Sequence, residues 1–164
     1  MCLGIDHKYH PKVFVHGDST KGAAVAKHDI VVWKMLSSER YCTINKAYMA
    51  ESPYRGFDYT FGKLTRPANG FTAEFCGYTG VGDVDYGLHA FYQKNSERVA
   101  LIRRRYAAKM YPAVIPKGSK FYMGHRGEIA SDQLIVFRNR RELLKAYGAE
   151  KYGTPVDRKV YSQV

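Results

Sequence analysis

The sequence has no long apolar run and few cysteines. No window approaches the roughly 18 consecutive apolar residues of a transmembrane helix, and the first eight residues lack the apolar core of a signal peptide. Cys2, Cys42 and Cys76 are scattered and form no C-x-x-C pair. We therefore expect a protein of a reducing compartment, with neither a disulfide framework nor a zinc site of the common spacing.

Acidic residues are also scarce. The 15 Asp and Glu stand against 26 Lys and Arg, which gives a formal net charge of +11 and excludes an acidic mimic of DNA. The length of 164 residues and the 45% hydrophobic content are typical of one globular domain. We assign residues 1–148 to this domain and residues 149–164, which are polar, to a C-terminal tail.

Hydrophobic periodicity predicts an α+β fold, with a mostly antiparallel sheet and two helices. The main helix is expected from residue 97 to about 110, with Ser96 as its N-cap and Pro112 after its end. A short helix is expected at 140–147, between a capping-box-like Asn139 and Gly148. Within the main helix the residues expected to face the core are Val99, Ile102, Tyr106 and Met110.

The predicted strands outnumber the helices, which is why α+β is the expected class. The most strongly patterned strand is Ile30–Leu36, which is apolar and β-branched. The glycine-rich segment 77–83 is expected to be a loop. Further strands are expected at 54–62, 70–76, 88–92, 113–115, 120–123 and 133–137.

Basic residues are concentrated in one segment. Between Arg98 and Arg126 there are eight cations and no acidic residue. Such a segment is commonly a solvated helix face, and it also suits a site for phosphates. No helix-turn-helix, zinc-finger or RNA-recognition signature accompanies it, so we expect only nonspecific affinity for nucleic acid.

Two segments suggest ligand binding. His89 follows a glycine-rich stretch, where an imidazole serves as a general base or as a donor to a ligand. Lys117 and Ser119 flank Gly118 in a segment that contains the residue types at the end of a P-loop. Their order differs from that of the motif, and the upstream glycine of the motif is absent. Their functional interpretation is a turn that faces a phosphate, and the alternative is a β-turn joining two strands.

Two arrangements suggest catalysis. Removal of the initiator Met would expose Cys2, whose amine could activate its own thiol as in N-terminal nucleophile enzymes. Arg55 and Glu128 loosely resemble the layout of an ADP-ribosyltransferase, but the intervening Ser-Thr-Ser element is absent. His7, His10 and His16 lack a fixed geometry and a carboxylate or thiolate partner, so we expect no metal site and no cofactor.

Taken in order, the motifs of residues 1–137 resemble a family of small proteins from bacteriophages and gut bacteria. Trp33 stands where that family commonly has Tyr. The resemblance implies a phage origin and a single structural unit, and it implies no chemistry. The segments that carry it are Met1-Cys2-Leu3, Asp29-Ile30 to Lys34, Ser52-Pro53-Tyr54 to Gly62-Lys63, Gly87-Leu88-His89, Ile115-Pro116-Lys117-Gly118-Ser119 and Ala130-Ser131-Asp132.

We therefore expect a phage protein that binds a nucleotide or another phosphate-bearing small molecule and withholds it from host defence. Cations would bind the phosphates and aromatic rings would stack on the base. Its location would be the cytoplasm of the bacterial host, and it could form a homo-oligomer. The residues expected at the site are His89, Arg55, Lys63, Lys117, Ser119 and Arg104, with Tyr54 and Tyr122 as stacking partners.

Two alternatives stay open. The first is a small enzyme that uses Cys2, His89 or Glu128 as catalytic residues. The second is an inhibitor that binds a host protein or nucleoprotein complex through the basic helix at 97–110.

Overall fold

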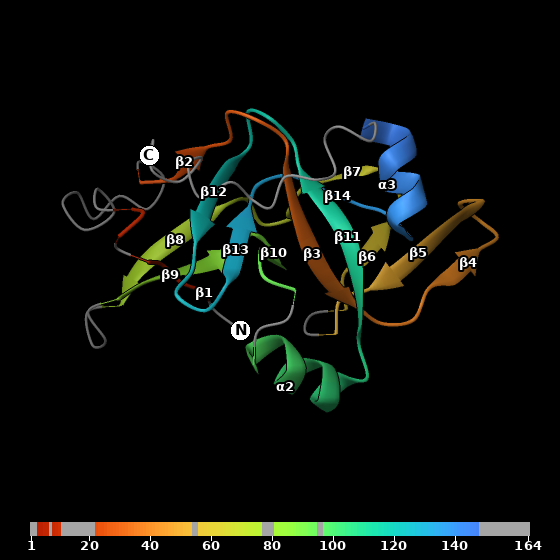
Figure 1. Ribbon diagram of the computed structural model, residues 1–164, viewed down its shortest axis with the longest axis horizontal. Coiled ribbons are helices and arrows are strands. Elements are labelled where there is room, and N and C mark those ends of the chain that lie inside the picture. Colours follow the sequence, from red (N-terminus) through yellow and green to blue (C-terminus); the bar gives the residue numbers. More distant parts are fainter. Residues whose placement is uncertain are drawn as a thin grey trace.

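The computed structural model describes residues 3–6, 8–10, 22–53, 56–76, 81–94 and 97–147. In this part of the chain an eight-stranded antiparallel sheet runs through the middle of the molecule (Figure 1). This confirms the α+β class with a mostly antiparallel sheet. In spatial order its strands are β2 (Ala24–Val25), β12 (Lys120–Met123), β13 (Glu128–Ser131), β10 (Leu88–Phe91), β3 (Ile30–Leu36), β11 (Lys109–Ile115), β14 (Leu134–Val136) and β7 (Leu64–Thr65).

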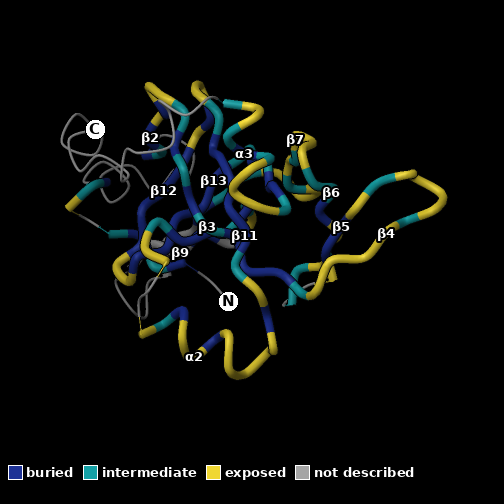
Figure 2. The backbone as a smooth tube through the Cα atoms, turned by 45° about the vertical axis from the view of Figure 1, so that its right-hand side comes forward, coloured by how far each residue is buried: buried dark blue, intermediate teal, exposed yellow. Residues whose placement is uncertain are grey.

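Two smaller antiparallel sheets and two helices complete the described chain. One small sheet extends away from the centre as the β4–β5 hairpin, which is largely exposed (Figure 2). The elements are β1 (Leu3–Gly4), β9 (Val81–Tyr86) and β8 (Thr72–Cys76) in one sheet, β4 (Arg40–Cys42), β5 (Ala47–Glu51) and β6 (Asp58–Thr60) in the other, and the helices α2 (Glu97–Tyr106) and α3 (Arg140–Tyr147).

Strand β3 separates the two sides of the core because successive side chains of a strand point to opposite faces. Met35 packs with Val99 and Ile102 of α2 on one face. On the same face, Val31 packs against the cluster that contains Leu143 of α3. Neither helix of the described chain has the length and apolar character that a membrane crossing requires.

The other face of β3 is covered by the β4–β6 sheet. Val32 and Leu36 belong to one buried cluster with Ala50 of β5 and Tyr59 of β6. Lys34 lies between Val32 and Leu36 in the alternation, so the pleat directs it toward this apolar cluster as well. A charged residue is therefore placed on the core side of the central strand.

The main helix is shorter than the sequence predicts. It ends at Tyr106, and Ala107 has a positive φ of 48°. Met110 belongs to β11, where it pairs with Met35, so the expectation of a helix to residue 110 is wrong. Long-range pairing with β3 overrides the local helical spacing. Val99 and Ile102 are buried as expected, whereas Tyr106 is 37% exposed.

Pro112 lies inside β11 rather than after a helix. It pairs with Trp33 of β3, and its carbonyl accepts a hydrogen bond from the Phe137 amide at 2.9 Å. Proline lacks the N–H that would donate back to the Phe137 carbonyl, which agrees with the end of β14 at Val136. The helix at 140–147 is confirmed, with the Asn139 side chain accepting from the Glu142 amide at 3.0 Å.

The strand predictions are confirmed in part. β3, β10, β12 and β14 lie where strands are expected, and β8 lies within the predicted 70–76 segment. Within the predicted loop at 77–83, the described residues from Val81 belong to β9. Within the predicted strand at 54–62, the described residues form a strand at Asp58–Thr60. Glu128–Ser131 forms β13, which the sequence analysis misses. Ser96, Gly148 and the tail at 149–164 lie outside the described residues.

His10 connects the first strand region to β12. Its Nδ1 donates to the Gly22 carbonyl at 3.2 Å, and its Nε2 accepts from the Met123 amide at 2.8 Å. A carbonyl only accepts and an amide N–H only donates, so the ring is neutral with its proton on Nδ1. Burial lowers the pKa of His10 from 6.5 to about 4.

This burial makes stability depend on pH. The unfolded chain binds a proton at His10 below pH 6.5 while the folded chain stays neutral down to about pH 4, so stability falls as the pH drops through this window. We expect a loss of about 3 kcal/mol from this residue. Urea unfolding at pH 7 and at pH 4.5 measures this loss. The free energy of unfolding should fall by about 3 kcal/mol less in His10→Gln than in the wild type, because glutamine does not titrate. The exposed His28 provides the control, and His28→Gln should follow the wild-type curve. Parallel curves for wild type and His10→Gln would contradict the assignment.

Candidate functional site

The central sheet has a gap in its pairing between β3 and β10. β3 forms seven registered pairs with β11, whereas it forms one with β10, between Phe91 and Trp33. Beyond that pair no further pair between β3 and β10 is registered among the described residues. His89 is the next β10 residue whose backbone groups face β3, because those of Ala90 face β13. Buried backbone groups are costly when they are left unpaired.

Lys34 contacts the β10 backbone at this point. Its Nζ donates a hydrogen bond to the carbonyl oxygen of His89 across the gap. The same Nζ lies 4.8 Å from the centre of the Tyr59 ring, over its face. The residue as a whole is only 6% exposed. The amine is thus fixed from two sides, by a backbone carbonyl of β10 and by an aromatic ring of β6.

Burial changes the protonation of this amine. It lowers the pKa of Lys34 from 10.5 to about 7, because the charged form is removed from water. No ion pair joins Lys34 to a carboxylate among the described residues, so nothing in that part of the chain offsets this loss of hydration by direct charge pairing. Burial also raises the pKa of Tyr59, which therefore stays neutral across the physiological range.

A cleft of about 260 Å³ opens at this gap. Lys34 and Met35 line it from β3, and residues from Tyr86 to Phe91 line it from the end of β9 and from β10. Phe57 and Tyr59 add aromatic walls. Enclosed apolar clefts with a few polar groups are the usual form of small-molecule sites. The cleft thus combines one buried amine with an aromatic lining.

Two residues singled out from the sequence, His89 and Glu128, also line this cleft. They lie on neighbouring strands, where Ala130 pairs with His89 and Glu128 pairs with Phe91. The carboxylate of Glu128 is 3.3 Å from Nε of Arg98 on α2. The structure therefore brings His89 and Glu128 to one place, together with the unexpected Lys34.

Lys117 and Ser119 lie in the turn between β11 and β12. Its amides donate to protein acceptors: Lys117 to the Asp29 carboxylate at 2.9 Å, Gly118 to Ala26 at 2.8 Å and Ser119 to Pro116 at 3.1 Å. Gly118 has a φ of 87°, which suits a glycine in a type II turn. The geometry is that of a β-turn joining two strands, and these three amides are not free to bind a phosphate.

The remaining expected site residues are dispersed. Tyr122 is completely buried and stacks on Phe71 with 5.4 Å between ring centres, so it offers no face to a base. Lys63 is exposed in the turn between β6 and β7, and Arg104 is exposed on α2. None of these three lines the cleft. Cys2, Tyr54 and Arg55 lie outside the described residues.

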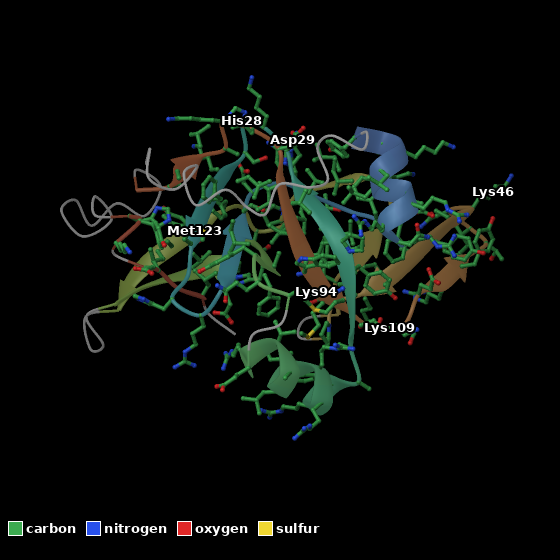
Figure 3. All side chains as sticks on the ribbon, in the orientation of Figure 1. His28, Asp29, Lys46, Lys94, Lys109 and Met123 are labelled. Atoms are coloured by element: carbon green, nitrogen blue, oxygen red, sulfur yellow. The ribbon has the colours of Figure 1, made fainter. Side chains whose placement is uncertain are left out.

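The basic segment 98–126 does not converge on one pocket. Figure 3 shows Lys109 near α2 and Asp29 at the opposite end of β11. The Lys117 amide binds Asp29, so this lysine and the arginines of α2 are separated by the length of that strand. Arg103, Arg104 and Arg105 are exposed to solvent. The solvated-face interpretation of the basic helix therefore holds for these arginines.

Lys34 is the site residue that sequence reasoning missed, although its signal is present. In Ile30–Leu36, Val32 and Leu36 lie at even positions and face the buried cluster that includes Ala50 and Tyr59. Lys34 also lies at an even position, so the pleat directs it to the same face. A lysine on the apolar face of a central strand is unusual because lysines are almost never fully buried.

The comparisons with known proteins add no name: no family model, curated protein or solved structure matches the chain. The assignment of a function therefore depends on the geometry of the cleft.

The buried amine gives a second pH-dependent contribution to stability. The folded-state pKa of Lys34, about 7, lies below its unfolded value of 10.5, so the unfolded chain binds more protons in this range. Stability should rise from pH 7 to pH 9 by up to about 1.4 kcal/mol per pH unit. In chemical unfolding, Lys34→Met should lack this rise, so its stability relative to the wild type should be highest at the lower pH. An exposed lysine serves as control, and Lys94→Met should keep the wild-type slope. Equal slopes for Lys34→Met and wild type would refute the assignment.

Ser119 provides a separate prediction. Its hydroxyl is buried, and among the described residues no hydrogen-bond partner reaches it. Removal of an unpaired buried hydroxyl is neutral or stabilising. We expect Ser119→Ala to match or exceed the wild-type melting temperature. A loss of several degrees would show that the hydroxyl makes a contact that this geometry lacks.

Proposed function

We propose that the chain binds a small anionic ligand with a planar body in the cleft between β3 and β10, and that nucleoside monophosphates represent this ligand class. The observation that carries the proposal is the buried Lys34 amine in an aromatic cleft. A protonated amine in apolar surroundings binds an anion strongly because little water competes. Phe57, which is half-buried, supplies a ring against which a planar group packs.

The size of the cleft favours a small ligand. Its 260 Å³ lies just below the range of about 300–1,000 Å³ that is usual for drug-sized ligands. Cyclic di- and trinucleotides carry two or three phosphates and bases, and the cleft has neither the volume nor the several cations to enclose them. A ligand with one anionic group requires one cation, and Lys34 is the lysine that lines the cleft.

The resemblance to phage proteins extends this proposal to a biological role. We propose that binding withholds a nucleotide-like signal from the host, in the cytoplasm of the infected cell. Arg103, Arg104 and Arg105 of α2 are not required for this role, since they are exposed and do not line the cleft.

The affinity for a monophosphate should depend on the charge of Lys34. Between pH 7 and pH 9 the amine loses its proton, so calorimetry with adenosine, guanosine, cytidine and uridine monophosphates should show affinity falling at least tenfold. The other titratable groups that line the cleft are Tyr59, Tyr86, His89 and Glu128. The ligand phosphate titrates near pH 6, below this window, and burial raises the pKa of Tyr59 and keeps that phenol neutral across it.

Variants separate the cleft from the surface charge. Lys34→Met should lower the affinity at pH 7 about tenfold or more, because it removes a charge-assisted contact. Arg104→Ala removes a cation from the exposed face of α2 and should leave the affinity within about twofold. The absence of heat with all four monophosphates, or a loss of binding in Arg104→Ala alone, would overturn the proposal.

A further inference from the structure

We propose that the Lys34 amine is a covalent attachment site, which forms an imine with an aldehyde or ketone group of a ligand held in the β3–β10 cleft. This inference rests on the proposed function, because it uses the same cleft. It deepens that function by naming a carbonyl group as the part of the ligand that the site recognises.

The position of the amine supports this role. Nζ is anchored by the His89 carbonyl and lies over the Tyr59 ring, so its location at the cleft is fixed without a salt bridge to a carboxylate among the described residues. A lysine that served only to fill space would be replaced at lower cost by methionine, which carries no polar group to desolvate. The pleat of β3 thus places the Lys34 amine at the wall of the β3–β10 cleft.

The protonation of the amine agrees with nucleophilic chemistry. Only the neutral amine carries the lone pair that attacks a carbonyl carbon. With a pKa of about 7, roughly half of Lys34 is neutral at pH 7, whereas an ordinary lysine is neutral to about one part in 10³ or less. Desolvated lysines are the usual hosts of such chemistry because burial shifts their pKa readily.

The reaction balances without any oxidant or reductant. The Nζ lone pair forms a bond to the carbonyl carbon, and the carbonyl π electrons pass to its oxygen, which takes up a proton. A proton leaves the nitrogen to give the carbinolamine, which then loses its hydroxyl and the second proton of the nitrogen as water, so that the nitrogen lone pair forms the C=N bond of the imine. Solvent water that enters the cleft takes up and returns these protons.

The test uses the full wild-type chain and pyridoxal 5′-phosphate, which carries one aldehyde, one phosphate and a planar ring. The chain is treated at pH 7.5 with less than one equivalent, reduced with borohydride to fix any imine as an amine, digested and mapped by mass spectrometry. We expect at least tenfold more label on Lys34 than on the exposed Lys94 or Lys109. No substitution is needed for this measurement, so a folding defect cannot obscure it.

A matched probe separates this inference from the proposed function. Pyridoxine 5′-phosphate has an alcohol in place of the aldehyde and binds only non-covalently. If it binds by calorimetry while the aldehyde labels surface lysines but not Lys34, the covalent proposal is overturned and the binding proposal survives. If neither probe engages the cleft, both are overturned. Lys34→Arg, which keeps a cation and a hydrogen-bond donor but loses the nucleophile, should retain binding of pyridoxine 5′-phosphate and lose selective labelling.

Discussion

The hydrogen bond from the Lys34 amine to the His89 carbonyl is the contact on which the candidate site depends. It lies where β3 and β10 stop pairing, after the single registered pair between Phe91 and Trp33. A continuous sheet would need no amine there and would leave no cleft. The gap in the ladder therefore accounts for two features together: an opening in the central sheet, and a buried lysine that satisfies the carbonyl exposed by it.

The packing around this gap explains why the amine stays out of water. Helix α2 covers the Met35 side of β3, and the β4–β6 sheet covers the Val32 and Leu36 side. Lys34 shares the latter side, so its stem lies among apolar residues and its Nζ reaches the cleft beside Tyr59. Burial of a cation in this position costs stability, and a binding site is a common reason for a protein to retain such a cost.

The sequence alone predicted the fold class, the central strand Ile30–Leu36 and the capped helix at 140–147, because these depend on local pattern. It mispredicted the end of the main helix, since Met110 has helical spacing but pairs with Met35 in the sheet. His89 and Glu128 were identified as chemically interesting, although nothing local placed them together. The sequence wrongly suggested that the basic residues of 98–126 form one anion site. Residues that are close in the sequence lie apart in the fold, because α2 with Arg104 precedes β11 and Lys117 follows it at the opposite end. Lys34 was missed because a strand containing one lysine still has the pattern of a strand.

The most direct test of this account is the titration of the Lys34 amine itself. The wild-type chain, labelled with ¹³C at the lysine ε carbons and assigned by comparison with Lys34→Arg, can be followed by NMR from pH 5 to pH 11. The account predicts that one ε-carbon signal titrates with a midpoint near pH 7, well separated from the other lysines. A midpoint near 10.5 for Lys34 would contradict it, because an amine with the ordinary lysine pKa is a solvated one.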